Sequence, residues 1–429
     1  MNRTATGDTT GILMPASAED LRAAPEQFLT RAMQAYGTLS ADNRVVSADR
    51  FEIFAGGNSG QKALLDVTYA RAEAGLPRRL FAKFSRDFAD PFRDRRRAEL
   101  DGEVRLAALS RLPAFPLAVP RAVFGDFEAK SGTGLLITER IAFGEGAIEP
   151  LHEKCMDHLL PDPLAYYRVL VSAQARLAAA QHRGALSPEV EALFPYDREA
   201  AQADLPIAYG PEELRAKVAA LGTFLAQHPQ LFPETLTDPA FPARLEAEAL
   251  AILQHEGAVR RFFHADPRFV ALCHWNANID NAWFWRESGG TLHCGLLDWG
   301  MVRPMNLATG LWGGLSASPI RFLQAELDGL LDHYRSELAA HGGPDLTAGL
   351  LDLHFDLSLA ITGLALMMDL PALITARMPD IGHAQGPFDP LLRRDKVVEG
   401  FLLVSTNFLH LWALRGFGGS LQRMLAMGS

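Results

Sequence analysis

Residues 273–300 read C-H-W-N-A-N-I-D-N-A-W-F-W-R-E-S-G-G-T-L-H-C-G-L-L-D-W-G. In this stretch Asn281 follows Asn276 by five positions, and Asp298 follows Asn281 by seventeen. Side-chain amides and carboxylates supply the hard oxygen ligands that Mg²⁺ prefers. We therefore predict that residues 273–281 form a catalytic loop and residues 298–300 a metal motif, with Asn281 and Asp298 as the metal ligands.

The composition is that of a folded, acidic protein. With 429 residues, 48% of them hydrophobic, the chain can bury a sizeable core and form two or three compact units. Its formal net charge of −10 argues against non-specific binding to nucleic acid or to an anionic membrane, because both depend on a surplus of Lys and Arg. We expect neither nucleic acid nor membrane among its partners.

The cysteines and the apolar runs predict a cytoplasmic location. Three widely spaced cysteines, an odd number, are typical of a reducing compartment. Residues 1–18 lack the basic and apolar segments of a signal peptide. The longest apolar run, residues 357–374, is interrupted by an aspartate and a proline, which predicts a buried helix and not a membrane span.

Short β-like runs are concentrated in residues 46–141, whereas residues 142–429 are mostly helical in pattern. Residues 1–45 form an N-terminal extension with an amphipathic segment, Ala18–Tyr36. The runs in the first part are Phe51–Phe54, Ala63–Tyr69, Leu80–Phe84, Arg121–Phe124 and Gly134–Thr138, with one helix at Phe92–Leu112. The second part has long helical stretches such as Leu164–Gln181 and Phe241–Phe263, and two β-like runs, Phe269–Cys273 and His293–Leu297.

These patterns predict an α+β fold with two lobes. A small N-terminal β-sheet lobe carrying one main helix would join a larger, mostly helical C-terminal lobe. The polar loop of residues 273–281 lies between short strands of the larger lobe, so a ligand would bind in the cleft between the lobes.

A glycine-rich turn separates the first two β-like runs. Glycines let a backbone approach a polyphosphate closely, and the N–H groups of such a turn can point at phosphate oxygens. A plain hairpin turn has the same appearance in sequence. The residues that we predict to bind nucleotide phosphates here are Gly56, Gly57, Asn58, Ser59 and Gly60.

Lys83 lies in the run Leu80–Phe84, where strand alternation puts it on one face with Phe81. A lysine among apolar neighbours needs a carboxylate or a phosphate as a partner. The predicted helix that follows offers Glu99 and Glu103, which are four positions apart and share a face. We predict an ion pair from Lys83 to Glu103, with Glu99 as the alternative, which would hold the ammonium over the phosphates of a nucleotide.

Two further predictions concern the ends of the cleft. The run that reaches Glu139 stops where the composition changes, which by itself indicates a buried strand followed by a linker. The backbone from Glu139 to Ile141 is the segment that we predict to hydrogen-bond the edge of an adenine. His274, at the start of the catalytic loop, is predicted to brace that loop and not to react.

Taken together, these residues resemble the aminoglycoside phosphotransferase and choline-kinase-like family, whose members have a protein-kinase-like fold. The resemblance covers most of residues 51–320. It implies ATP and Mg²⁺ as cofactors and a small-molecule hydroxyl as the substrate. The matching positions are the glycine loop at Gly56–Gly60, the ATP-anchoring Lys83, the helix glutamate Glu103, the hinge at Glu139–Ile141, the catalytic loop at His274-Trp275-Asn276 with Asn281, and the metal motif at Asp298-Trp299.

The chain departs from the family at three positions. Asn276 stands in place of the catalytic aspartate, Asn306 in place of a second aspartate, and Trp275 in place of a glycine. An amide cannot accept a proton at neutral pH, so Asn276 can orient a hydroxyl but cannot act as its base. We predict that nucleotide and metal binding survive while transfer to an alcohol is slow, unless Asp280 supplies the carboxylate.

The sequence leaves three functions open. The first is an ATP-dependent phosphotransferase acting on a small-molecule hydroxyl, with His274, Asn276 and Asp280 in its catalytic loop. The second is a weak or inactive pseudokinase that binds a nucleotide or metabolite and acts through a protein partner. The third is a non-enzymatic protein whose cleft, near several tryptophans, binds an apolar ligand.

Overall fold

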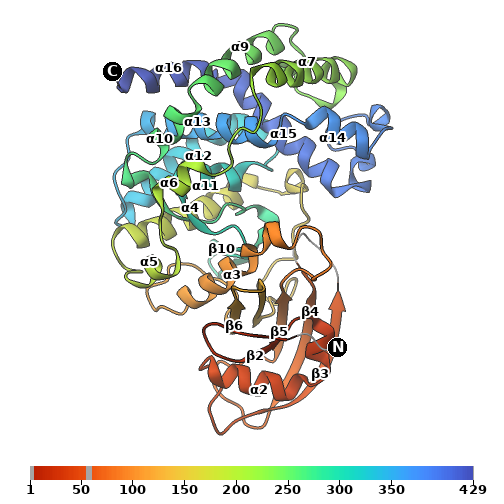
Figure 1. The fold of residues 1–429 in the computed structure, drawn as a ribbon, viewed down its shortest axis with the longest axis vertical. Helices are drawn as coiled ribbons and strands as arrows, with labels where there is room; N and C mark the ends of the chain where they lie inside the picture. The colour runs from red at the N-terminus through yellow and green to blue at the C-terminus, as the bar shows by residue number, and fades with distance from the viewer. Residues whose placement is uncertain (1–3, 55–59, 429) are drawn as a thin grey trace.

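The computed structural model describes residues 4–54 and 60–428, which form two lobes of unequal size (Figure 1). The smaller lobe, at the bottom of Figure 1, is built on a five-stranded antiparallel sheet with the order β3-β4-β5-β7-β6. The predicted α+β fold is confirmed, and all five predicted β-like runs lie in this sheet. Its strands are β3 (Val45–Phe54), β4 (Lys62–Tyr69), β5 (Arg79–Phe84), β6 (Ala122–Glu128) and β7 (Thr133–Glu139).

Alternation along the sheet separates a core face from a cleft face. Ala63, Ala82 and Phe84 are almost completely buried in the hydrophobic core of the smaller lobe. Phe81 and Lys83 alternate with them on β5 and line a cavity between the lobes. The predicted orientation of Phe81 and Lys83 is therefore correct.

Residues before the sheet pack onto it as two short strands and two helices. β1 (Thr4–Thr6) and β2 (Leu13–Pro15) pair with each other, and the turn between them is fixed by backbone hydrogen bonds to the buried Asp126. The amphipathic segment Ala18–Tyr36 is not one helix but two, α1 (Ala18–Arg22) and α2 (Pro25–Ala35). Pro25 has no N–H to continue a helix, so it starts a new one.

The main helix of the smaller lobe, α3 (Ala98–Leu109), packs on β6 and β7. It is shorter than the predicted Phe92–Leu112, because its N-terminal end is a 3₁₀ turn over Asp94–Arg96. α3 also approaches the larger lobe closely, since a Cβ placed on Gly102 would lie 3.5 Å from the carbonyl oxygen of Gly300.

The larger lobe is mostly helical. The predicted stretch Leu164–Gln181 falls within α4, whereas Phe241–Phe263 breaks at His255 into α9 and α10. The apolar run at 357–374 is not one helix, because it spans the end of α13 and the start of α14. The helices are α4 (Pro163–His182), α5 (Glu189–Leu193), α6 (Arg198–Ala203), α7 (Pro211–Gln227), α8 (Glu234–Thr237), α9 (Phe241–Gln254), α10 (Glu256–Phe263), α11 (Leu307–Leu315), α12 (Ile320–Ala340), α13 (Ala348–Leu366), α14 (Leu370–Arg377), α15 (Lys396–Arg415) and α16 (Phe417–Met427).

Four short strands flank the predicted catalytic loop, whereas the sequence predicted two strands there. β8 (Val270–Cys273) and β10 (Leu292–Leu296) lie where the β-like runs were expected. Each pairs with a strand that was not predicted: β8 with β11 (Arg303–Asn306), and β10 with β9 (Ala282–Arg286). These two antiparallel pairs hold both ends of the loop.

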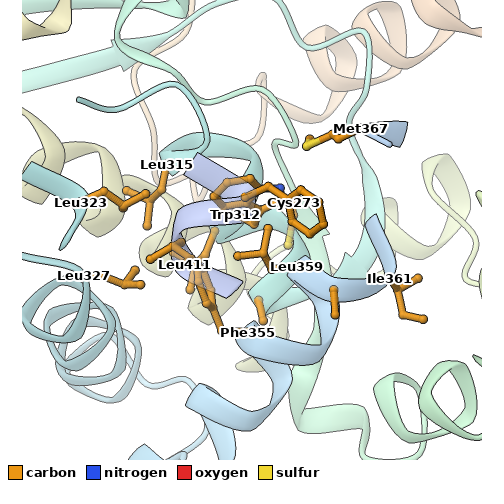
Figure 2. Packing of buried hydrophobic residues seen from close by; sticks show 14 of the residues in the cluster. Cys273, Trp312, Leu315, Leu323, Leu327, Phe355, Leu359, Ile361, Met367 and Leu411 are labelled. Carbon is orange, nitrogen blue, oxygen red and sulfur yellow. The ribbon is translucent and has the colours of Figure 1, made fainter. Parts of the chain in front are cut away.

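The hydrophobic core of the larger lobe lies beside the predicted catalytic loop. Figure 2 shows Trp312 of α11 beside Cys273 of β8, with Phe355 of α13 nearby. Trp312 is fully buried, and so is most of α13. Two helices, α13 and α15, are long and apolar enough to cross a membrane by these two measures alone, but most of each is packed inside the lobe.

Candidate active site

A cavity of about 580 Å³ lies between the lobes, which is a typical size for a small-ligand pocket. The sheet contributes Lys62, Leu64, Phe81 and Lys83 to its wall. The larger lobe contributes polar residues from the two predicted motifs. The predicted site residues that line this cavity are Lys83, Glu103, Glu139, Ile141, Asn281 and Asp298.

Lys83 is the centre of the charge network in this cavity. Its ammonium forms an ion pair with Glu103 of α3 and donates a 2.8 Å hydrogen bond to Asp298. Glu103, and not the alternative Glu99, is therefore the partner of Lys83. Glu99 instead faces Arg86 and Arg96, at 3.5 and 2.9 Å.

Burial and neighbouring charges shift the pKa values of Lys83, Glu103 and Asp298 in different directions. Desolvation opposes the charged form of Lys83, but Glu103 and Asp298 outweigh it and raise the pKa of Lys83. Desolvation raises the pKa of Glu103, and the Lys83 ammonium opposes that rise. Burial would also raise the pKa of Asp298, but Lys83 lowers it below its ordinary value. The cation and the aspartate are thus both held in their charged forms.

A backbone hydrogen bond joins the segments that carry Asp298 and Asn281, and both residues line the cavity. The N–H of Leu297 donates a 2.8 Å hydrogen bond to the carbonyl oxygen of Asn281, so the residue before Asp298 is joined directly to the end of the catalytic loop. Asp298 has a left-handed backbone, with φ of 57°, and its side chain is 49% exposed. The chain therefore turns sharply at Asp298 and presents its carboxylate to the cleft.

The amide of Asn281 is oriented by the loop itself. Its Nδ2 donates a 2.9 Å hydrogen bond to the carbonyl oxygen of Asn276. The Oδ1 atom is then left as the atom that can accept from a ligand or bind a cation. Asn281 and Asp298 together offer two hard oxygen donors, the number that Mg²⁺ takes from protein in many phosphate-binding sites. The residues present fit such an ion.

His274 is locked as a neutral brace. Its Nε2–H donates a 2.7 Å hydrogen bond to the carbonyl oxygen of Leu297, while its Nδ1 accepts from the backbone N–H of Asn276 at 3.1 Å. The ring packs against Trp299, with 4.2 Å between centroids. Burial lowers the pKa of His274 to about 4, so the ring is uncharged at neutral pH. The bracing role of His274 stays a prediction, for which these two hydrogen bonds supply a geometry.

Asn276 is half-buried and touches a second amide. The side chains of Asn276 and Asn278 are 2.6 Å apart. The Nδ2 of Asn278 donates to the Oδ1 of Asn276. An amide oxygen has two lone pairs, so the Oδ1 of Asn276 can still accept from a hydroxyl.

Asp280, on the same loop as Asn276, carries a carboxylate that can act as a base. Asp280 is half-buried, and desolvation raises its pKa while Lys154 opposes the rise. A higher pKa is the direction that makes a carboxylate a better base.

Trp275 contributes backbone packing, because a Cβ on Gly313 would lie 1.7 Å from the Trp275 carbonyl oxygen. α11 thus needs glycine at position 313 for the loop to sit where it does.

The glycine-rich turn is only partly described. Gly56, Gly57, Asn58 and Ser59 lie outside the described residues, so their predicted role stays a prediction. Gly60 is described, and a Cβ there would lie 2.1 Å from the carbonyl oxygen of Ser85. Its backbone therefore runs directly against the end of β5, beside Lys83.

Of the three N–H groups from Glu139 to Ile141, one has no hydrogen-bond partner among the described residues. The N–H groups of Glu139 and Arg140 donate to the carbonyl oxygens of Arg121 and Arg79, at 2.8 and 3.0 Å. The N–H of Ile141, which lines the cavity, has no hydrogen-bond partner among the described residues. Ile141 is therefore the position in this segment at which an adenine ring nitrogen can accept.

Two features of the cleft escaped sequence reasoning. Lys62 lines the cavity directly across from Lys83, because the two are register partners on β4 and β5. The contact between Lys83 and Asp298 was not predicted either, since 215 positions separate them. Strand alternation could have indicated which face of β4 carries Lys62. Its partner on β5, however, depends on a strand register that one sequence does not reveal.

The chain was also compared with known proteins. No family model and no curated protein matches it. Among solved structures it is similar to a microcompartment-associated aminopropanol kinase, with 12% identity over 92% of this chain and 99% of that one and a TM-score of 0.44. It is also similar to choline kinase from Cryptosporidium parvum Iowa II, with 12% identity over 88% and 90% of the two chains and a TM-score of 0.41.

A third similar structure is a spectinomycin phosphotransferase in complex with ADP and spectinomycin, with 9% identity over 88% and 94% of the two chains and a TM-score of 0.41. The chain itself has an α+β fold of two lobes, with a small antiparallel sheet lobe, a larger helical lobe, and a helix glutamate bonded to a lysine of the sheet. Function has to be inferred from the residues of the cleft, because identities and TM-scores this low carry no argument about activity.

Proposed function

We propose that the protein is an ATP-dependent phosphotransferase that acts on the hydroxyl group of a small molecule. The observation that carries this proposal is the bond of Lys83 to both Glu103 and Asp298 inside a cavity between the lobes. Such a lysine is poised to contact phosphates, since its ammonium is fixed in place and lies beside a carboxylate that can bind a cation.

Each part of a nucleotide has matching groups in the cleft. The N–H of Ile141 and the carbonyl oxygen of Glu139 would bind the adenine edge, and the apolar side chains of Leu64 and Phe81, on one face of the sheet, would contact the nucleotide between there and the phosphates. Lys83 and the backbone near Gly60 would bind the phosphates. Asn281 and Asp298 would hold Mg²⁺, which when bound neutralises charge on the phosphates that face it.

The catalytic loop supports a slow transfer. Asn276 can accept a hydrogen bond from the substrate hydroxyl and orient it, but it cannot take the proton. General-base assistance is typically worth about 10²–10⁴-fold, so its loss slows transfer without affecting the groups that hold the nucleotide. Asp280 on the same loop would be the residue that supplies a carboxylate.

Asn276 also favours a second candidate function. A kinase-like protein that holds a nucleotide but transfers no phosphate would act as a pseudokinase, through a bound metabolite or a protein partner. Both functions require nucleotide binding, so turnover is what separates them. The third possibility, an apolar-ligand protein, has less support because Trp283 and Trp312 are buried in the fold away from the cavity, and of these three tryptophans only Trp299 lines it.

The test has two stages on the full chain. ATP with Mg²⁺ should raise the melting temperature of the wild type, because a ligand at 100 times its Kd adds about 2.7 kcal/mol of stability. Lys83→Met should lose most of that shift, while Lys130→Met, an exposed lysine outside the cavity, should keep it.

The second stage measures ADP release against a panel of hydroxyl compounds that includes amino alcohols and aminoglycosides. Turnover that disappears in Lys83→Met would support the phosphotransferase. A nucleotide-dependent thermal shift without turnover on any compound would leave the pseudokinase. No shift with ATP or ADP would contradict both.

A further inference from the structure

A second lysine, Lys62, lies in the same cavity as Lys83. The two are direct partners in the antiparallel pairing of β4 with β5, and both line the cavity. Directly opposite residues of an antiparallel pair project from the same face with their Cβ atoms about 5 Å apart. Lys62 is half-buried and Lys83 is buried, so the two ammonium groups share one partly desolvated space.

This arrangement is costly unless anions are present. Like charges directly opposite each other destabilise a sheet. Desolvation and the charge of Lys83 lower the pKa of Lys62, while Asp298 and Glu103 oppose that shift. Both carboxylates are bonded to Lys83, and a phosphate chain in the cavity would bring further negative charge beside the two ammonium groups.

Lys62 stands at the phosphate end of the cleft. On β5, Leu80 pairs with Glu139 of the linking segment, and Lys83 lies three residues further along. At about 3.3 Å per residue, the two lysines are about 10 Å along the strand from the adenine-binding position. Leu64 and Phe81, also register partners, line the cavity wall between the two lysines and the adenine-binding position. Gly60, at the end of the glycine-rich turn, is two residues before Lys62.

We propose that Lys62 binds the phosphate tail of the nucleotide together with Lys83, so that two lysines on neighbouring strands form the phosphate site. This inference rests on the proposed function, because it assigns the tail of the same nucleotide. The ligand class is a nucleoside di- or triphosphate, and adenosine without phosphates would not engage Lys62.

A consequence concerns the divalent ion. Asn276 removes a negative charge from the loop that faces the phosphates, and Lys62 adds a positive charge to the sheet above them. Both changes strengthen the attraction of the protein itself for an anionic tail. Nucleotide binding is therefore expected to depend less on Mg²⁺ in this chain when Lys62 is present than when it is removed.

The experiment measures the Kd of ATP and of adenosine for the full chain, with Mg²⁺ and with EDTA. A charge-assisted hydrogen bond to phosphate is worth roughly 10- to 100-fold in Kd. Lys62→Met should weaken ATP binding by that factor, most strongly in EDTA, and should leave adenosine binding unchanged. Lys62→Arg should retain most of the affinity, and Lys130→Met should behave as wild type.

The outcomes separate this inference from the proposed function. If the wild type binds ATP and Lys62→Met binds it equally well, Lys62 does not contact the phosphates. If Lys62→Met weakens ATP and adenosine to the same extent, the lysine only shapes the cavity and the inference is wrong. If the wild type binds no ATP, the proposed function itself fails. Should Lys62→Met not fold, as judged by its melting without ligand, Lys62→Gln takes its place in the same titrations.

Discussion

Two asparagines, Asn276 in the catalytic loop and Asn306 at the start of α11, stand where the family resemblance would place aspartates, but the structure holds them differently. Asn306 is buried and uses its whole amide: Nδ2 donates to the carbonyl oxygen of Phe263 and to Nδ1 of His354, and Oδ1 accepts from Ala308. Asn276 is half-buried, and its side chain contacts one other amide.

The difference separates a structural amide from a chemical one. A carboxylate at position 306 could keep the cap on α11 but could not donate to a carbonyl oxygen, so the fold itself requires an amide there. Among the described residues, the side chain of Asn276 has no comparable set of bonds to the core. Its amide is therefore expected to matter for the reaction and not for stability, and the following substitutions test that contrast.

The largest effect is expected for Asn276→Asp. A carboxylate at this position can accept the proton of the substrate hydroxyl, so turnover should rise by about 10²–10⁴-fold, or about 3–5 kcal/mol in the barrier. The measurement is kcat on the best compound of the hydroxyl panel. With Mg²⁺ present, the Kd of ATP should weaken by far less than turnover gains, because Lys83 and Asp298 are untouched and the ion offsets the added negative charge; a loss of ATP binding with no gain in turnover would contradict the contrast.

Asp280→Ala should have the next largest effect. If Asp280 supplies the carboxylate that Asn276 lacks, the residual turnover of the wild type should fall about 10²-fold. In the double variant Asn276→Asp with Asp280→Ala, the loss should be much smaller, because the loop again has a base. Equal losses in both backgrounds, measured by kcat, would show that Asp280 does not serve this purpose.

Asn306→Asp should destabilise the fold by roughly 1–3 kcal/mol at neutral pH, since it places a carboxylate against the carbonyl oxygen of Phe263 in a buried site. Urea unfolding measures this free energy. Asn276→Asp is the matched control, and it should lose less than about 1 kcal/mol. Similar losses for both variants would remove the distinction between the two asparagines.

The smallest expected effect, taken per pH unit, is on the pH dependence of stability. The pKa of His274 is about 4 in the folded chain against an ordinary value of 6.5, so the unfolded state binds more protons between these values. Stability should therefore fall as the pH is lowered from 6.5 to 4. His274→Gln can still donate to the Leu297 carbonyl oxygen but does not titrate.

The slope of the unfolding free energy with pH in that window should consequently decrease by up to about 1.4 kcal/mol per pH unit in His274→Gln. Between pH 7 and 8 the slopes of variant and wild type should coincide, which serves as the internal control. An unchanged slope between pH 4 and 6.5 would mean that the ring is not the neutral brace described above.

The sequence predicted what depends on local pattern. The five runs of the sheet, the helix that carries Glu103 and the loop from His274 to Asn281 follow from strand alternation, helical period and residue spacing. The catalytic loop and the metal motif were recognisable because the polar residues of each follow an apolar strand. The ion pair of Lys83 followed from the cost of leaving a lysine among apolar neighbours unpaired.

What the sequence did not predict depends on long-range pairing. β9 and β11 are short, and each is a strand only because β10 or β8 supplies its hydrogen bonds. Lys62 faces Lys83 through a strand register, and Asp298 reaches Lys83 across the cleft. The match of Asn306 to Phe263 and His354 likewise joins residues that are distant in the chain.

The most direct test of the account is a crystal structure of the full chain with a non-hydrolysable ATP analogue and Mg²⁺. The account predicts the adenine at the N–H of Ile141, the phosphates on Lys83 and Lys62, the metal ion on Asn281 and Asp298, and the amide of Asn276 facing the γ-phosphate. A nucleotide bound elsewhere, or a Lys83 that stays bonded to Asp298 with no phosphate or metal ion near either residue, would contradict it.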